Sequence, residues 1–99
     1  MRNYRQVVDL LNRRLGHYVK GDGVKYIYVD MKEDGPLQCT VILRSPVEKS
    51  RIVSVATRYI HVFDDMIDTV DIDVLSTEQY FKPTETMFPI YRERKGFDL

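Results

Sequence analysis

The chain has 99 residues, with 15 basic and 15 acidic side chains and therefore a formal net charge of zero. This length is typical of one domain, since single domains most often contain about 100–150 residues. A composition of 43% hydrophobic and 11% aromatic residues excludes a disordered or fibrous chain. The balanced charge argues against a protein whose whole surface attracts nucleic acid.

A single cysteine, Cys39, excludes an internal disulfide and favours a reducing compartment. Neither a membrane-spanning apolar run nor the apolar core of a signal peptide is present. We therefore expect an intracellular, cytoplasmic protein (the host cytoplasm if the source is a virus, where short chains of this kind are frequent). Amide residues are few, which is typical of proteins from hot environments.

The first predicted element is an amphipathic helix over residues 4–15, because its apolar residues recur at helical spacing. Asn3 is a suitable N-cap, and Gly16 is a suitable residue to end the helix. The expected buried face consists of Tyr4, Val7, Val8, Leu11 and Leu15.

Two alternating segments, 24–32 and 37–44, flank an Asp-Gly turn and predict a β-hairpin. Side chains alternate between the two faces of a strand, so Tyr26 and Tyr28 are expected to point away from the aliphatic face. That aliphatic face carries Ile27, Val29 and Met31 in the first strand and Leu37, Cys39, Val41 and Leu43 in the second.

A second helix is predicted from Pro46 to about residue 67. Ser45 is a suitable N-cap, proline suits the first helical position, and Glu48 completes a capping box. The many β-branched residues weaken helix propensity and leave open a break near Arg58 followed by a strand. The expected buried face consists of Ile52, Val55, Ala56, Tyr59, Phe63 and Met66.

Residues 70–75 alternate again and predict a third strand that pairs with the hairpin. Residues 76–78 could start one further helical turn, and residues 83–99 read as an extended C-terminal arm. The sequence thus predicts an α+β domain over residues 1–82, in the order α-β-β-α-β. In it, two helices pack on one face of a small, mostly antiparallel sheet of three to four strands.

Five aspartates lie within ten residues, near the expected C-terminus of the second helix. Asp71 and Asp73 share a strand face and could both reach one hard cation, which makes them weak candidates for a metal site. A charged edge strand kept soluble is the simpler interpretation. Acids near a helix C-terminus oppose the helix dipole, so a basic partner is expected for them. The five are Asp64, Asp65, Asp68, Asp71 and Asp73.

No constellation of residues indicates catalysis. Cys39 lies on the predicted aliphatic face, where a free cysteine behaves as a small hydrophobic residue. One cysteine with His17 and His61 matches no zinc-ligand spacing, and no serine lies in a nucleophile-elbow context. We therefore expect a protein that is not an enzyme and that needs no cofactor.

The two tyrosines of the first strand could be covered by the arm, by another protein or by nucleic acid. We predict a non-enzymatic protein–protein interaction module of the small adaptor or inhibitor type. It would form a homodimer through the aromatic sheet face or by exchange of the arm, with a further partner that the sequence does not define. The interface candidates are Tyr26, Tyr28, Phe88, Ile90, Tyr91 and Phe97.

The alternative hypothesis is binding of RNA or single-stranded DNA, because exposed aromatic rings beside basic groups can stack bases. The candidate residues are Arg13, Arg14, Lys25, Tyr26, Tyr28 and Arg44.

The zero net charge conceals an uneven distribution of charge. Residues 1–25 hold six basic and two acidic groups, whereas residues 64–85 hold one basic and seven acidic groups. The basic segment 92–95 is a further electrostatic complement of the acidic one. The sequence therefore predicts a molecule with two poles that is complementary to itself.

Overall fold

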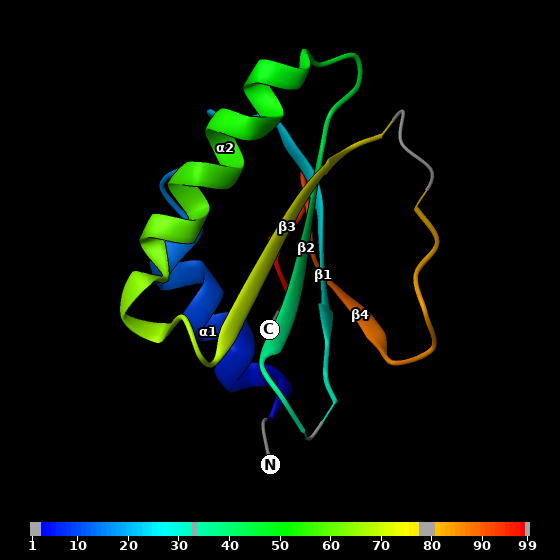
Figure 1. Cartoon of the computed structure of the whole chain (residues 1–99). Coiled ribbons are helices and arrows are strands. Elements are labelled where there is room, and N and C mark those ends of the chain that lie inside the picture. The colour runs from blue at the N-terminus through cyan, green and yellow to red at the C-terminus, as the bar shows by residue number, and fades with distance from the viewer. Residues whose placement is uncertain (1–2, 33, 78–80, 99) are drawn as a thin grey trace.

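The computed structural model describes residues 3–32, 34–77 and 81–98 (Figure 1). The described residues form two α-helices and five strands, and a short 3-10 helix follows the second α-helix. In order, the elements are α1 (Tyr4–Leu15), β1 (Val24–Asp30), β2 (Leu37–Leu43), α2 (Lys49–Val62), η1 (Asp64–Met66), β3 (Val70–Ser76), β4 (Met87–Arg92) and β5 (Gly96–Phe97).

The strands form one mixed sheet in the order β3-β2-β1-β4-β5. β1 runs antiparallel to both β2 and β4, and β4 runs antiparallel to β5. β3 runs parallel to β2 because α2 carries the chain back between them. The α+β class and the hairpin are confirmed, and the expected further helical turn at residues 76–78 reaches beyond the described residues, which stop at 77 before resuming at 81.

The expected count of three to four strands was wrong, because the segment predicted as an extended arm contains β4 and β5. Pro89 concealed β4 in the sequence, since proline cannot donate to a strand ladder. In the structure Pro89 lies opposite Tyr28, whereas β5 pairs only with Tyr91 and Arg92. The missing N–H group of Pro89 therefore costs no bond to β5.

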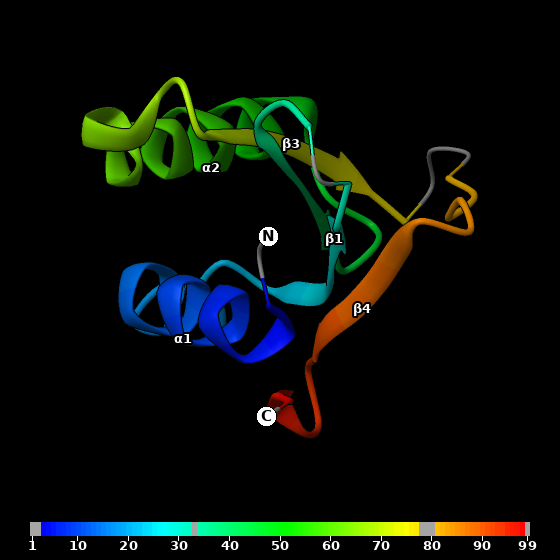
Figure 2. The same cartoon turned by 90° about the horizontal axis from the view of Figure 1, so that it is seen from below.

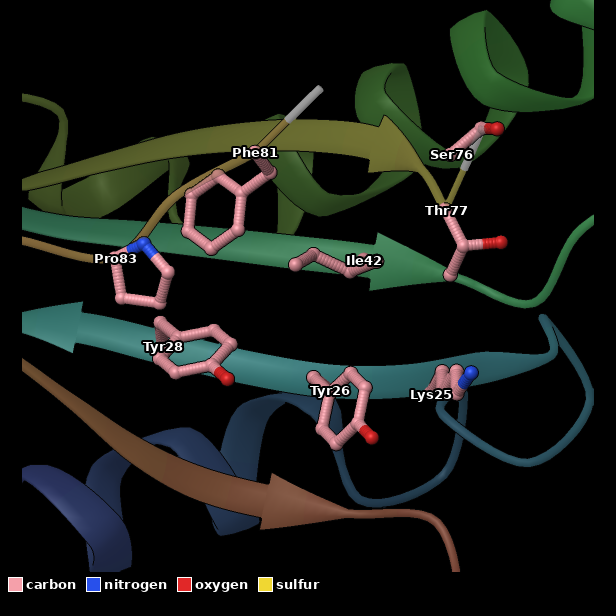
Figure 3. Close-up of a pocket in the computed structure, with 8 residues that line it drawn as sticks. All are labelled: Lys25, Tyr26, Tyr28, Ile42, Ser76, Thr77, Phe81 and Pro83. Atoms are coloured by element: carbon pink, nitrogen blue, oxygen red, sulfur yellow. The ribbon is translucent and has the colours of Figure 1, made fainter. Parts of the chain in front are cut away.

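Both helices cover the same face of the sheet, as predicted (Figure 2). α1 lies beside the half formed by β1 and β4, and α2 lies beside β3. One core fills the space between the helices and the sheet, and Phe81 and Pro83, which precede β4, lie on the opposite face (Figure 3). We call that second face the outer face.

α1 has its predicted bounds and caps. The Gln6 backbone N–H donates to Asn3 Oδ1 at 3.0 Å, and Gly16 is the C-cap residue. Four of the five expected core residues are buried and Tyr4 is half-buried, because its hydroxyl reaches the rim of the sheet at Pro89.

α2 begins three residues later than predicted. Its N-cap is Glu48, which makes no side-chain capping bond, so the expected capping box was wrong. Half-buried Val47 packs against the core. The extended backbone at Glu48, just before the helix, allows this contact. The helix continues through Arg58, which excludes the alternative of a strand after Arg58. The predicted end near residue 67 was wrong, because the helix ends at Val62, where Phe63 leaves helical geometry with φ −108°, and η1 follows. All six residues expected on its inner face are buried or half-buried.

Two of the three described glycines with positive φ angles belong to the β-hairpin and the turn before it. Gly23 has φ 71° just before β1, and Gly35 has φ 82° in the hairpin turn. Only glycine adopts this region without a steric penalty, which explains the turns read from the sequence. Among the described residues, no helix has the length and apolar character that a membrane span requires.

Candidate functional site

Tyr26 and Tyr28 form the centre of a cleft on the outer face of the sheet (Figure 3). Their ring centroids lie 6.1 Å apart, and the Phe81 ring lies 5.4 Å from that of Tyr28. The cleft has a volume of about 260 Å³ and a floor at Ile42 of β2. Its lining comprises Lys25, Tyr26, Tyr28, Ile42, Ser76, Thr77, Phe81 and Pro83.

Both tyrosines are half-buried, and the residues over Tyr28 come from just before the predicted arm and from its first residue, Pro83. Phe81 and Pro83 lie over Tyr28, before the chain enters β4 (Figure 3). The rest of the predicted arm extends the sheet beside β1 instead of folding over the rings. Tyr26 keeps the more open position, next to Lys25 (Figure 3).

A basic rim continues from the cleft around the end of the sheet. A second hollow of about 340 Å³ shares Lys25 and Tyr26 with the cleft and adds Arg92, Glu93 and Arg94. Lys25 Nζ lies 5.5 Å from the centroid of the Tyr26 ring, within cation–π range. Glu93 accepts hydrogen bonds from Arg44 at 2.8 and 3.0 Å.

We define the basic rim as Lys25, Arg92 and Arg94. Within the described part of the chain, none of these three cations forms an ion pair. An anionic ligand would therefore not compete with an internal carboxylate for them.

The other interface candidates lie away from the tyrosine cleft. Ile90 and Tyr91 are buried, and burial, together with nearby Glu93, raises the pKa of Tyr91. Phe97 packs against Tyr91 with ring centroids 5.2 Å apart. Phe88 is exposed and meets the Tyr4 ring edge to face. These aromatic residues therefore attach α1, β4 and β5 to one another.

The basic candidates divide between the two faces. Lys25 lies in the cleft and Arg44 close to it, on the far side of Glu93. Arg13 is exposed on α1, which covers the opposite face of the sheet. Arg14 forms a two-pronged ion pair with Asp65, with distances of 2.8 and 2.9 Å. Arg92 and Arg94 were missed because the sequence placed them in an arm.

The acidic segment has a basic partner within the chain, because Arg14 pairs with Asp65. A basic partner was expected, since acids near a helix C-terminus oppose the helix dipole. Arg14 Nη1 also donates to the Val62 carbonyl oxygen at the end of α2. Its hydrogen bonds to Asp65 hold the pKa of that carboxyl below its ordinary value and raise the pKa of Arg14 itself. The tail at 92–95 does not fill this role, because it lies at the opposite edge of the sheet.

Asp71 and Asp73 are exposed on the edge strand β3, as their alternation predicted. Asp71 accepts a hydrogen bond from Gln38 Nε2 at 3.0 Å. Across residues 3–32, 34–77 and 81–98, no three His, Cys, Asp or Glu side chains gather as a metal site would require.

Cys39 is buried in the core, where desolvation raises its pKa to about 12. The thiolate is the nucleophilic form, so this side chain is chemically inert near neutral pH. His17 and His61 are both exposed, on α1's C-terminal side and on α2.

A second surface feature escaped sequence analysis. Val53, Ile60 and Ile67 are 57%, 49% and 66% exposed, and they recur every seven residues. Ile60 and Ile67 also line a groove of about 170 Å³ with Phe63, Val70 and Ile72. We call Val53 and Ile60 of α2, together with Ile67 just after η1, the α2 stripe. The seven-residue spacing of Val53 and Ile60 within the predicted helix was the signal available in the sequence.

Comparison with protein-family models, with curated proteins and with solved structures finds no match for this chain.

Proposed function

We propose that this chain is a non-enzymatic protein-interaction module that acts as a homodimer through the α2 stripe. The observation that carries this proposal is the concentration of exposed apolar side chains. Four large hydrophobic residues are exposed among those described, and three of them belong to the stripe. Exposed apolar patches are typical of interaction surfaces.

Charge complementarity favours a second copy as the occupant. Lys49 lies one turn before Val53, and Asp64 follows Ile60 by four residues, at the start of η1 just beyond the end of α2. In an antiparallel packing of α2 against its copy, the register that places Val53 against the partner's Ile60 also places Lys49 against the partner's Asp64. Two-fold symmetry forms each contact twice. Within the described segments, neither charge has an ion-pair partner in its own chain.

The other routes to a dimer are less favourable. Exchange of the arm would require β4 to leave β1, with which it pairs from Tyr26 to Asp30. Pairing of β3 with its copy would bring Asp71 and Asp73 close to the same carboxylates of the partner, and like charges directly opposite are destabilising. Packing through α2 avoids both costs.

A dimer of this kind would suit an adaptor. The α2 stripe borders the β3 edge of the sheet, on the side that the helices cover. The cleft lies on the outer face. Self-association would therefore leave both clefts open, so that one dimer carries two identical binding surfaces.

Light scattering coupled to size-exclusion chromatography tests the proposal directly. We expect a dimer at tens of micromolar, and a monomer for Ile60→Asp, because a buried carboxylate at the centre of the interface is strongly unfavourable. Ser54→Asp adds the same charge to α2 outside the stripe and should leave the dimer intact. A wild-type chain that stays monomeric at high micromolar concentration would contradict the proposal.

A charge exchange tests the register. Lys49→Asp should weaken the dimer about tenfold, since it places a carboxylate against Asp64 at two symmetric positions. Asp64→Lys should have a similar effect, and the double exchange should restore most of the affinity, measured by sedimentation equilibrium. If the double variant is no tighter than the single variants, the antiparallel register is wrong.

A further inference from the structure

The cleft on the outer face and the basic rim form one continuous surface. The rings of Tyr26, Tyr28 and Phe81 line the cleft, and Lys25 follows Tyr26 toward the start of β1 (Figure 3). Arg92 and Arg94 continue this surface where β4 ends. Tyr26 lies opposite Arg92 in the register of β1 and β4, so a ring and a guanidinium occupy adjacent strands at the same level. The fold thus places flat apolar groups and positive charges side by side.

This combination fits one class of ligand best. Aromatic rings stack on the faces of bases, and a neighbouring row of cations follows the phosphates of the same strand. The cleft is smaller than the roughly 300–1,000 Å³ of pockets that enclose a drug-sized ligand, so it suits flat groups entering from an open strand. Sheets with exposed aromatic residues stack two or three bases in this way.

We propose that the outer face binds single-stranded nucleic acid. Bases stack against Tyr26 and Tyr28, with Phe81 as the opposing wall, and the phosphates lie along the basic rim. This binding site is independent of the α2 stripe, so it goes beyond the proposed homodimer and does not require it.

The distribution of charge favours nucleic acid over an acidic protein segment. The hollow lined by the rim contains one carboxylate, Glu93, and Arg44 already pairs with it at 2.8 Å. A rim made only for a carboxylate-rich peptide would not need the three rings beside it. An acidic peptide is therefore the competing occupant that the experiment must separate.

Fluorescence anisotropy with labelled ten-nucleotide probes tests the inference. We expect oligo-dT and oligo-U to bind at 50 mM salt with a dissociation constant below about 100 µM. The same sequence in a duplex should bind more weakly, because its bases are not free to stack. If neither single strand binds at 50 mM salt, the inference is wrong.

The salt dependence counts the phosphate contacts. Three contacts give a slope of about −2 in a plot of log affinity against log salt, so the affinity should fall about fifteenfold between 50 and 200 mM. Arg92→Ala should reduce the magnitude of this slope by about 0.7, the share of one phosphate contact on a single strand. Arg13→Ala removes the same charge from α1 on the opposite face and should leave the slope unchanged.

Ring substitutions separate stacking from charge. Tyr28→Ala should weaken binding about tenfold, whereas Tyr28→Phe keeps the ring and should bind like the wild type. Circular dichroism would confirm that both variants fold. If Tyr28→Ala leaves the affinity unchanged, or if a ten-residue polyglutamate probe binds as tightly as oligo-dT, the inference is overturned in favour of an acidic protein partner. The monomeric Ile60→Asp variant should still bind the probes, so this test can fail or succeed independently of the dimer.

Discussion

At the scale of single residues, Asp22 connects the glycine turn before β1 to α2. Its side chain is buried, and Oδ1 accepts a hydrogen bond from Arg58 and lies 3.5 Å from Arg51 Nη2. Arg51 Nη2 also donates to the Gly21 carbonyl oxygen at 3.0 Å. Burial and then the Asp22 carboxylate raise the pKa of Tyr59, so the tyrosine remains neutral beside it.

Removal of this carboxylate should destabilise the fold. We expect Asp22→Ala to lower the free energy of unfolding by about 2 kcal/mol, below the usual loss for a fully buried pair because both arginines are partly exposed. Urea unfolding would measure the change. Asp9→Ala removes an exposed carboxylate of α1 and should change stability by less than about 0.5 kcal/mol. Equal effects of the two substitutions would contradict a structural role for Asp22.

The raised pKa of Cys39 predicts a loss of stability in alkaline solution. The folded thiol keeps its proton up to about pH 12, whereas the unfolded thiol titrates near its ordinary value of 9.0. The unfolded state therefore binds fewer protons above pH 9, and the free energy of unfolding falls as pH rises. Between pH 8 and 10 this contribution is about 1.4 kcal/mol. Cys39→Ala should remove it from urea unfolding curves, while the contributions of the tyrosines cancel in the comparison. Parallel pH profiles for the two proteins would contradict the prediction.

At the scale of elements, periodicity alone located α1, the hairpin, α2 and β3, because each buries one face against the same core. Local signals were less reliable where tertiary contacts outweighed them. The capping box predicted at Ser45 does not form, and Val47 instead packs against the core. β4 was not predicted because it contains Pro89. Tyr26 and Tyr28 could be found from alternation, whereas Arg92 and Arg94 join them only through strand pairing that is distant in sequence.

The uncapped N-terminus of α2 offers a test at this scale. Glu48 occupies the N-cap position without a capping bond, so Glu48→Ser should stabilise the protein by about 1 kcal/mol by satisfying one free N–H group of the first turn. Thermal unfolding would detect the change. Ser45→Ala should have little effect, because Ser45 is not the cap. A loss of stability on Ser45→Ala that matches an ordinary cap deletion would show that the capping box forms after all.

At the scale of the whole molecule, the registers separate the charges along the strands. Asp30, Asp71 and the preceding Asp68 lie at one end of the sheet, because Asp30 pairs with Gln38 and Gln38 with Asp71. The basic rim lies at the other end, where Tyr26 pairs with Arg92. The two poles predicted from the sequence are therefore present, although strand ends rather than the N-terminal helix define the basic one.

Separated poles on a neutral chain predict weak attraction between molecules at low salt. Near the isoelectric point of about 6.7, the acidic end of one molecule attracts the basic end of another, and salt screens this attraction over a Debye length that shrinks from about 30 Å at 0.01 M to about 8 Å at 0.15 M. Static light scattering should give a negative second virial coefficient at 10 mM salt that moves toward zero at 150 mM. The Ile60→Asp monomer suits the measurement, since dimerisation then does not contribute. Replacing both Arg92 and Arg94 with glutamate should abolish the salt dependence of the second virial coefficient, because the basic pole loses its charge. If the attraction persists in that variant, the two poles do not drive the association.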